Sequence, residues 1–182
     1  MNTFVAKCGC NCSKCPTYKN NLRTFEDRQR CNRGWKKYLN INLSAEKLRP
    51  CDGCSIPDET RKIYYLNCHV RKCAINNGFN NCAYCSAYPC QEVLNIHSMQ
   101  KPGAKEKIVE RLGGSIPEED YLAFIEPYEG IKHLNEIRQT IGAEEIVEIK
   151  RFSVRPKIVL IPNDLLFSKN RLFNIVKNFI IN

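Results

Sequence analysis

The chain has 182 residues, of which 43% are hydrophobic and 26% are charged, a composition typical of a soluble globular protein with one or two domains. Its formal net charge of +9 is concentrated in residues 1–100, which hold 15 Lys and Arg against 7 Asp and Glu. No stretch approaches the roughly 18 uninterrupted apolar residues of a membrane-spanning helix, and the opening MNTFVAKC lacks the apolar run of a signal peptide. These features argue against membrane insertion, and we expect a cytoplasmic protein.

In the first half, apolar residues at helical spacing predict a helix or helical pair over residues 17–39. Ser44 is a candidate N-cap for a following short helix. Residues 68–77 predict a short helix stopped by Gly78, and QEVLNIHSM after Cys90 predicts another.

The second half begins with KPGAK and contains no cysteine. The pattern Ser115-x-x-Glu118 predicts a capping box for a helix that ends near Pro127, and IKHLNEIRQTIG predicts a second helix. EIVEIKRF alternates like a strand, KIVLIP is typical of a buried strand, and Asp164 starts a final amphipathic helix. We therefore predict an α+β fold, with a small Cys-rich metal-stabilised module over residues 1–99 and a helix-rich segment with one or two strands over 101–182 that packs on it.

All 12 cysteines precede residue 91. Because disulfides are rare in a reducing cytosol, clustered cysteines there indicate metal binding more than a disulfide framework or reactive thiols. Three Cys-x-x-Cys units stand out, because two intervening residues let the chain turn so that both sulfurs reach one ion. They are Cys12/Cys15, Cys51/Cys54 and Cys82/Cys85.

The remaining cysteines are judged singly. Cys68 and Cys73 are separated by about 140° around an ideal helix, so both can bind one ion only if Cys68 precedes the helix. Cys90 stands at the start of a helix, whose positive end favours a thiolate. Cys31 shares a helical face with Trp35 and is interpreted as a buried core thiol. The predicted metal ligands are Cys8, Cys12, Cys15, Cys51, Cys54, Cys68, Cys73, Cys82, Cys85 and Cys90.

The pairing of these ligands cannot be derived from their order. Three arrangements remain open. They are two filled four-cysteine sites with two spare thiols, one thiolate-bridged cluster, and three sites that also use Cys10 and Cys31. His69 and His97 are interpreted as surface or capping residues. Each four-cysteine zinc site adds a net charge of −2, so two such sites lower the formal charge from +9 to +5. The excess of basic residues therefore partly compensates the negative charge of metal sites, and it is only weak evidence for nucleic-acid binding.

Together the stretches CGCNCSKCPTY, CDGC and CHVRKCAINNGFNNCAYCSAYPC resemble the cysteine-rich prokaryotic family called domain of unknown function 3795. The matching positions are Cys8, Cys12, Cys15 and Tyr18, then Cys51 and Cys54, then Cys68 and Cys73, and finally Cys82, Cys85, Tyr88 and Cys90. The resemblance covers about residues 8–92 and implies zinc binding, with no settled activity. Family members often carry a C-terminal extension resembling EEDYLAFIEPYEG. Cys10 and Cys31 depart from the family pattern.

We expect a zinc-binding interaction module with structural four-cysteine sites and a protein partner that the sequence does not identify. An iron–sulfur electron-transfer protein is one alternative, although the full ferredoxin spacing is absent. Nucleic-acid binding through RQRCNRGWKKY is another, in which Trp35 and Tyr38 would stack on bases; we favour a helix with Trp35 inside. No Walker, GxGxxG or HExxH motif occurs, so we do not expect an enzyme, although a zinc with three protein ligands would activate water.

Overall fold

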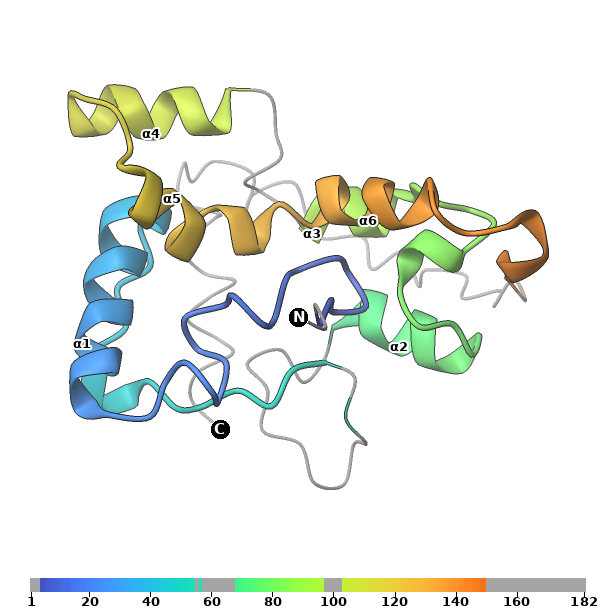
Figure 1. Ribbon diagram of the computed structural model, residues 1–182, viewed down its shortest axis with the longest axis horizontal. Helices are drawn as coiled ribbons and strands as arrows, with labels where there is room; N and C mark the ends of the chain where they lie inside the picture. The colour runs from blue at the N-terminus through green and yellow to red at the C-terminus, as the bar shows by residue number, and fades with distance from the viewer. Residues whose placement is uncertain (1–3, 55, 57–67, 97–102, 150–182) are drawn as a thin grey trace, which may run out of the picture. The chain divides into compact units, whose positions relative to one another are not determined.

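The computed structural model describes residues 4–54, 56, 68–96 and 103–149 (Figure 1). All of them lie in the first of two compact units, Met1–Lys150. The predicted domain boundary near residue 100 falls between described ranges. Within those ranges, no helix is both long enough and apolar enough to cross a membrane.

Helices and short helical turns make up the regular structure of the described ranges (Figure 1). The α-helices are α1 (Phe25–Gly34), α2 (His69–Asn76), α3 (Gln91–Ile96), α4 (Ala104–Leu112), α5 (Glu118–Phe124) and α6 (Gly130–Arg138). A π-helical turn, η1 (Trp35–Leu39), continues α1, and 3₁₀ turns form η2 (Ala45–Lys47), η3 (Cys82–Tyr84), η5 (Glu126–Tyr128) and η6 (Ala143–Glu145). The predicted helices that fall on described residues are present. The helix predicted over 17–39 begins only at Phe25, and those predicted over 115–127 and 131–142 are shorter than expected.

The predicted α+β class is wrong, because the described residues contain no β-strand. Their strand-like pairings are three isolated bridges, Val5–Asn11, Tyr18–Cys51 and Cys85–Val147. A strand needs a neighbouring strand along its length to pair its backbone groups. Val147 instead exchanges hydrogen bonds with the irregular loop after η3, through the Tyr84 carbonyl (2.7 Å) and the Ser86 amide (3.0 Å). The predicted strand over 157–162 and the helix from Asp164 lie outside the described residues.

The N-terminus of α1 is set by local hydrogen bonds. The Thr24 side chain accepts a bond from the Asp27 amide (3.1 Å), and the Asp27 carboxylate accepts one from the Thr24 amide (2.7 Å), which forms a capping box. The capping box predicted at Ser115 is wrong, because α5 begins after Pro117 without a side-chain cap. Pro117 is itself the N-cap residue, and a proline disfavours helical backbone at the residue before it, which keeps Ile116 out of the helix.

One hydrophobic core, here called the aromatic core, lies where α1 and η1 pack beside α5 (Figure 1). Tyr38 and Phe124 stack in it with ring centroids 5.9 Å apart. Gly34 makes this packing possible, because a Cβ there would lie 2.2 Å from the Phe124 ring. The buried residues of the aromatic core are Leu22, Cys31, Trp35, Tyr38, Leu48, Ile108, Phe124 and Ile125.

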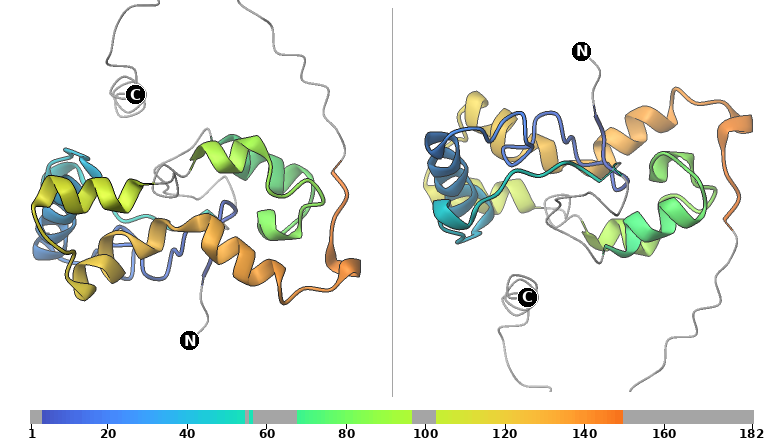
Figure 2. Two further views of the ribbon diagram at one scale, coloured as in Figure 1. Left: turned by 90° about the horizontal axis from the view of Figure 1, so that it is seen from above. Right: turned by 90° about the horizontal axis from the view of Figure 1, so that it is seen from below.

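A second core, here called the sulfur-rich core, lies between α2, α3, η3 and α6. Its buried residues are Val70, Ala74, Phe79, Cys82, Ala83, Cys85, Val93 and Leu134, and Cys8, Cys68 and Cys90 pack against it. The N-terminal loop runs beside η5 and α6 (Figure 2), where the Asn11 amide donates to the Pro127 carbonyl (2.8 Å). This loop carries the first four cysteines toward both cores.

Candidate metal centre

The two N-terminal Cys-x-x-Cys units lie side by side. The Cys15 amide donates to the Cys12 carbonyl (3.1 Å), which closes a tight turn over the first unit. A parallel bridge joins Tyr18 to Cys51, and the Cys51 amide donates to the Thr17 carbonyl at 2.8 Å. This bridge brings the second unit next to the first. We call these residues the first cysteine group: Cys12, Cys15, Cys51 and Cys54.

The electrostatics of the first cysteine group agree with this placement. Burial raises the pKa of Cys12, and the charges of Cys54 and Cys15 raise it further. Burial also raises the pKa of Cys54 to about 12, with further contributions from Cys8 and Cys51. Like charges inside a protein act strongly only on near neighbours. Negative charge on these partly and fully buried sulfurs is therefore costly without a cation nearby.

Cys82, Cys85 and Cys90 lie in or against the sulfur-rich core, and Cys73 is exposed. The Cys85 amide donates to the Cys82 carbonyl (3.2 Å) across η3. Cys73 comes from α2, and Cys90 immediately precedes α3, whose Leu94 amide donates to the Cys90 carbonyl (3.1 Å). The charges of Cys90, Cys85 and Cys73 all act on Cys82, whose pKa is raised mainly by burial and then by Cys8. We call these residues the second cysteine group: Cys73, Cys82, Cys85 and Cys90.

Cys8 and Cys68 lie between the two groups. The charge of Cys8 acts on Cys54 in the first group and on Cys82 in the second. Cys68 is the N-cap residue of α2. It therefore precedes the helix, which is the condition under which Cys68 and Cys73 could bind one ion. Burial is the main cause that raises its pKa, and Cys8 raises it further. The pKa of Cys73 is raised by burial and then by the charges of Cys85 and Cys90. Cys68 and Cys73 are therefore influenced by different cysteines.

Cys31 is buried in the aromatic core, where it is 1% exposed, as interpreted from the sequence. Burial raises its pKa to about 12. Cys10 is close to Cys8, and a hydrogen bond between their side chains is the main cause that raises the pKa of Cys10. His69 is exposed at the start of α2, and His97 lies outside the described residues. All twelve cysteines are in the reduced form, without a disulfide among them.

The donor chemistry of both groups fits zinc, which binds four thiolates in its structural sites. Over residues 4–54, 56, 68–96 and 103–149, no group of three or more His, Cys, Asp or Glu side chains is arranged to hold a metal ion. The groups therefore bring the right ligands together without the final coordination geometry.

Residues 4–95 match the family described as "Protein of unknown function (DUF3795)". The chain belongs to this family. The resemblance drawn from the cysteine pattern is thereby confirmed. No curated protein and no solved structure matches the chain. The DUF3795 match includes all twelve cysteines and ends before α4, so the packing of residues 103–149 on the cysteine groups lies beyond it.

Two arginines hold the cysteine loops, and neither could be identified from the sequence. Arg71 of α2 is 1% exposed and donates to the carbonyls of Cys54 and Ile56, each at 2.9 Å. Its positive charge lowers the pKa of Cys54, against the larger effect of burial. Arg138 of α6 donates to the Cys85 carbonyl at 3.0 Å. Each guanidinium therefore fixes a carbonyl of one cysteine group and places a positive charge beside its sulfurs.

A buried polar network joins the N-terminal loop to the segment beyond the DUF3795 match. His133 is buried, and its ring nitrogens lie 2.9 Å from the Gly9 carbonyl and 3.4 Å from the Glu126 carboxylate. Lys14 donates to the same carboxylate at 2.9 Å. The sequence identified none of these residues, because the contacts between the loop and this segment join positions more than 110 apart. The network holds the first cysteine group against η5 and α6.

The aromatic side chains of the basic segment RQRCNRGWKKY are not available to stack on bases. Trp35 is 8% exposed and Tyr38 is 2% exposed, and both belong to the aromatic core. The basic side chains beside them, such as Lys36, are exposed. The placement of Trp35 inside the fold is therefore confirmed, and the segment presents charge without stacking partners.

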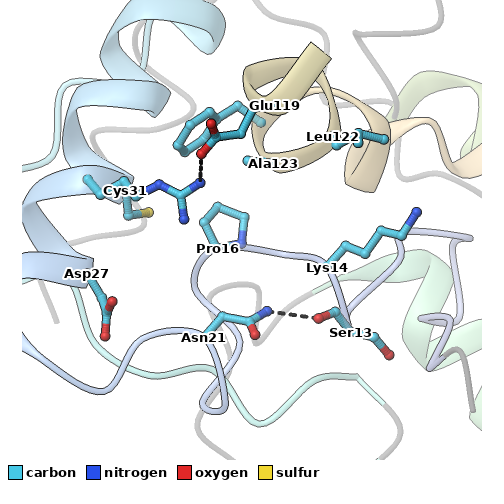
Figure 3. Close-up of a pocket in the computed structure, with 11 residues that line it drawn as sticks. Ser13, Lys14, Pro16, Asn21, Asp27, Cys31, Glu119, Leu122 and Ala123 are labelled. Atoms are coloured by element: carbon cyan, nitrogen blue, oxygen red, sulfur yellow. Dashed lines mark hydrogen bonds and ion pairs between the residues drawn. The ribbon is translucent and has the colours of Figure 1, made fainter. Parts of the chain in front are cut away.

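A pocket of about 450 Å³ opens beside the first cysteine group, lined from the N-terminal loop, α1 and α5 (Figure 3). Its charged side chains are engaged within the chain. Arg30 pairs with Glu119 (3.3 Å), Lys14 pairs with Glu126, and Asp27 caps α1. Cys31 also lines the pocket. The charged side chains that line the pocket therefore already have partners within the chain.

Proposed function

We propose that this DUF3795 protein is a zinc-binding module in which each cysteine group holds one ion as a structural four-cysteine site. The observation that carries the proposal is the bridge between Tyr18 and Cys51, which sets two Cys-x-x-Cys turns next to one another. Two such turns supply the four sulfurs of a tetrahedral zinc site. Metal binding would draw these side chains into the coordination shell, because zinc binding and local folding are coupled.

The charge distribution supports this proposal. A buried guanidinium is costly unless negative charge lies nearby. Arg71 lies beside Cys54 and Cys68, whose pKa values its charge lowers. A zinc ion with four thiolates carries a net charge of −2 and would give Arg71 a permanent anionic neighbour. Clustered cysteines with Cys-x-x-Cys spacing are typical of metal sites in a reducing compartment, which suits a cytoplasmic location.

The biological role that fits such sites is presentation of a folded surface to a partner. Zinc is redox-silent, so a structural site contributes stability and shape. Cys8 and Cys68 lie between the groups, where they would extend either site or bridge them. We assign no reaction to the protein.

Elemental analysis and visible spectroscopy of protein purified without oxygen test the proposal. We expect one zinc for each group and no visible absorption, because Zn²⁺ has a filled d shell. Cys54→Ser should lose the ion of the first group, and Cys82→Ser that of the second. Cys31→Ser is the matched control, because this thiol is also buried but packs in the aromatic core, and it should keep both ions.

Wild-type protein without metal would contradict the proposal. Equal metal loss in Cys31→Ser and Cys54→Ser would contradict the assignment of ligands to the groups. Iron and sulfide with a brown colour would instead support the iron–sulfur alternative.

A further inference from the structure

A chain of three side chains ends on the sulfur of Cys15. The Trp35 indole nitrogen lies 2.8 Å from the Tyr128 hydroxyl oxygen, and this oxygen lies 3.5 Å from the Cys15 sulfur. The Thr17 hydroxyl lies 3.3 Å from the same sulfur. Tyr128 lies beyond residues 4–95, the part that matches DUF3795.

The direction of these hydrogen bonds follows from the chemistry of the donors. An indole N–H can only donate, so the Tyr128 oxygen accepts from Trp35. A metal-bound Cys15 thiolate has no proton to donate, so in that state the single hydroxyl proton of Tyr128 would be directed to the Cys15 sulfur.

The backbone holds Tyr128 at this position through neighbouring contacts. Lys14 pairs with Glu126 at 2.9 Å, and the Asn11 amide donates to the Pro127 carbonyl at 2.8 Å. Three successive residues of η5, Glu126–Tyr128, are therefore each attached to the loop that carries Cys15. On the other side, the π-helical turn η1 begins at Trp35; such turns occur frequently at functional sites.

We propose that Tyr128, oriented by Trp35, is a positioning residue that donates a hydrogen bond to the metal-bound sulfur of Cys15. The inference rests on the proposed zinc site of the first cysteine group. A hydrogen bond to a ligating thiolate fixes its direction and withdraws part of its charge, which tunes the metal site. The segment beyond the family match would thus adjust the first metal site without supplying a ligand.

Substitution of Tyr128 by phenylalanine tests the inference on the full chain. Tyr128→Phe keeps the ring and removes only the hydroxyl. We expect zinc affinity at the first group to fall about 10-fold in chelator competition, the size of effect typical of such outer-shell partners. In protein reconstituted with Co²⁺, the sulfur-to-cobalt charge-transfer band should shift, because the Cys15 sulfur regains electron density. A purely structural role would leave the position of this band unchanged.

The matched control is Tyr121→Phe, which removes a hydroxyl that donates to Glu129 at 2.8 Å, away from the first cysteine group. It should leave both zinc affinity and the cobalt spectrum unchanged. Trp35→Phe removes the donor that orients Tyr128 and should shift the same band in the same direction. It provides the test should Tyr128→Phe fail to fold.

The outcomes separate the two proposals. Wild-type protein that binds neither zinc nor cobalt overturns the proposed function, and this inference with it. Wild-type protein that binds both, while Tyr128→Phe matches it in affinity and in spectrum, overturns the inference alone.

Discussion

The two hydrophobic cores of the first unit differ in the side chains that fill them. The aromatic core is filled mainly by large side chains such as Trp35, Tyr38 and Phe124. In the sulfur-rich core, half of the buried residues are alanine or cysteine: Ala74, Ala83, Cys82 and Cys85. Burying a large apolar side chain contributes about 1.5–3 kcal/mol, whereas an alanine contributes far less. The aromatic core therefore has its own source of stability, and the sulfur-rich core depends more on what its cysteines bind.

The largest expected difference between the two cores is their response to metal removal. With a strong chelator, we expect amides of α2 and α3 to lose their protection from hydrogen exchange, because a structural zinc site contributes about 10–16 kcal/mol to the folding of small domains. Amides of α1 should keep much of theirs. Hydrogen exchange with mass spectrometry, before and after chelation, measures both sets in one sample.

Equal loss of protection in α1 and α2 would show that the cores unfold as one unit. Unchanged protection of α2 after complete metal removal would contradict a structural role for the metal. Re-addition of zinc should restore the original pattern.

The same contrast explains which features could be predicted from the sequence. Cys-x-x-Cys spacing is a local signal, so the candidate ligands and the family could be recognised from residues such as Cys51 and Cys54. Helical periodicity likewise predicted α2 nearly to its ends and the start of α6, although α6 ends earlier than expected, at Arg138. Both signals depend on residues within a few positions of one another.

The features that could not be predicted depend on distant partners. The alternation around Val147 predicted a strand, but a strand requires a second strand, and this residue bridges to the loop at Cys85. The groups that hold the cysteine loops, such as Arg71 and Tyr128, are ordinary helix or turn residues until the fold brings them to a cysteine. The pairing of cysteines into groups depends in the same way on the bridge at Tyr18.

Gly34→Ala should weaken the aromatic core without involving the metal. The new Cβ would lie 2.2 Å from the Phe124 ring, and that ring is stacked on Tyr38 and cannot move freely. Overpacking of this kind costs about 1–3 kcal/mol, which exceeds the gain of up to about 1 kcal/mol from replacing glycine in a helix. We expect a lower free energy of unfolding in denaturant titration, with unchanged zinc content.

Gly114→Ala is the matched control, because nothing lies within 4 Å of a Cβ at that position. The double variant Gly34→Ala with Phe124→Leu should cost less than the sum of its single changes, since the smaller side chain leaves room for the methyl group. Strict additivity of the two changes would contradict the contact.

The smallest expected effect concerns acid sensitivity at the start of α1. Hydrogen bonds from the Thr24 and Arg23 amides lower the pKa of Asp27 below its ordinary value of 3.8. A carboxylate whose pKa is lowered by folding stabilises the folded state above its unfolded pKa, and that contribution is lost as the pH falls through the folded value. The first turn of α1 should therefore stay capped at about pH 5 and loosen only below pH 3.8.

NMR titration of the Thr24 amide in the wild type and in Asp27→Asn measures this transition, and the variant should lose it. A midpoint at or above 3.8 in the wild type would show that the capping box does not hold the carboxylate. Because the capping box lies within α1 and its hydrogen bonds involve no cysteine, the transition should keep the same midpoint after chelation. That result would show that the first turn of α1, like the aromatic core, is stable independently of the metal.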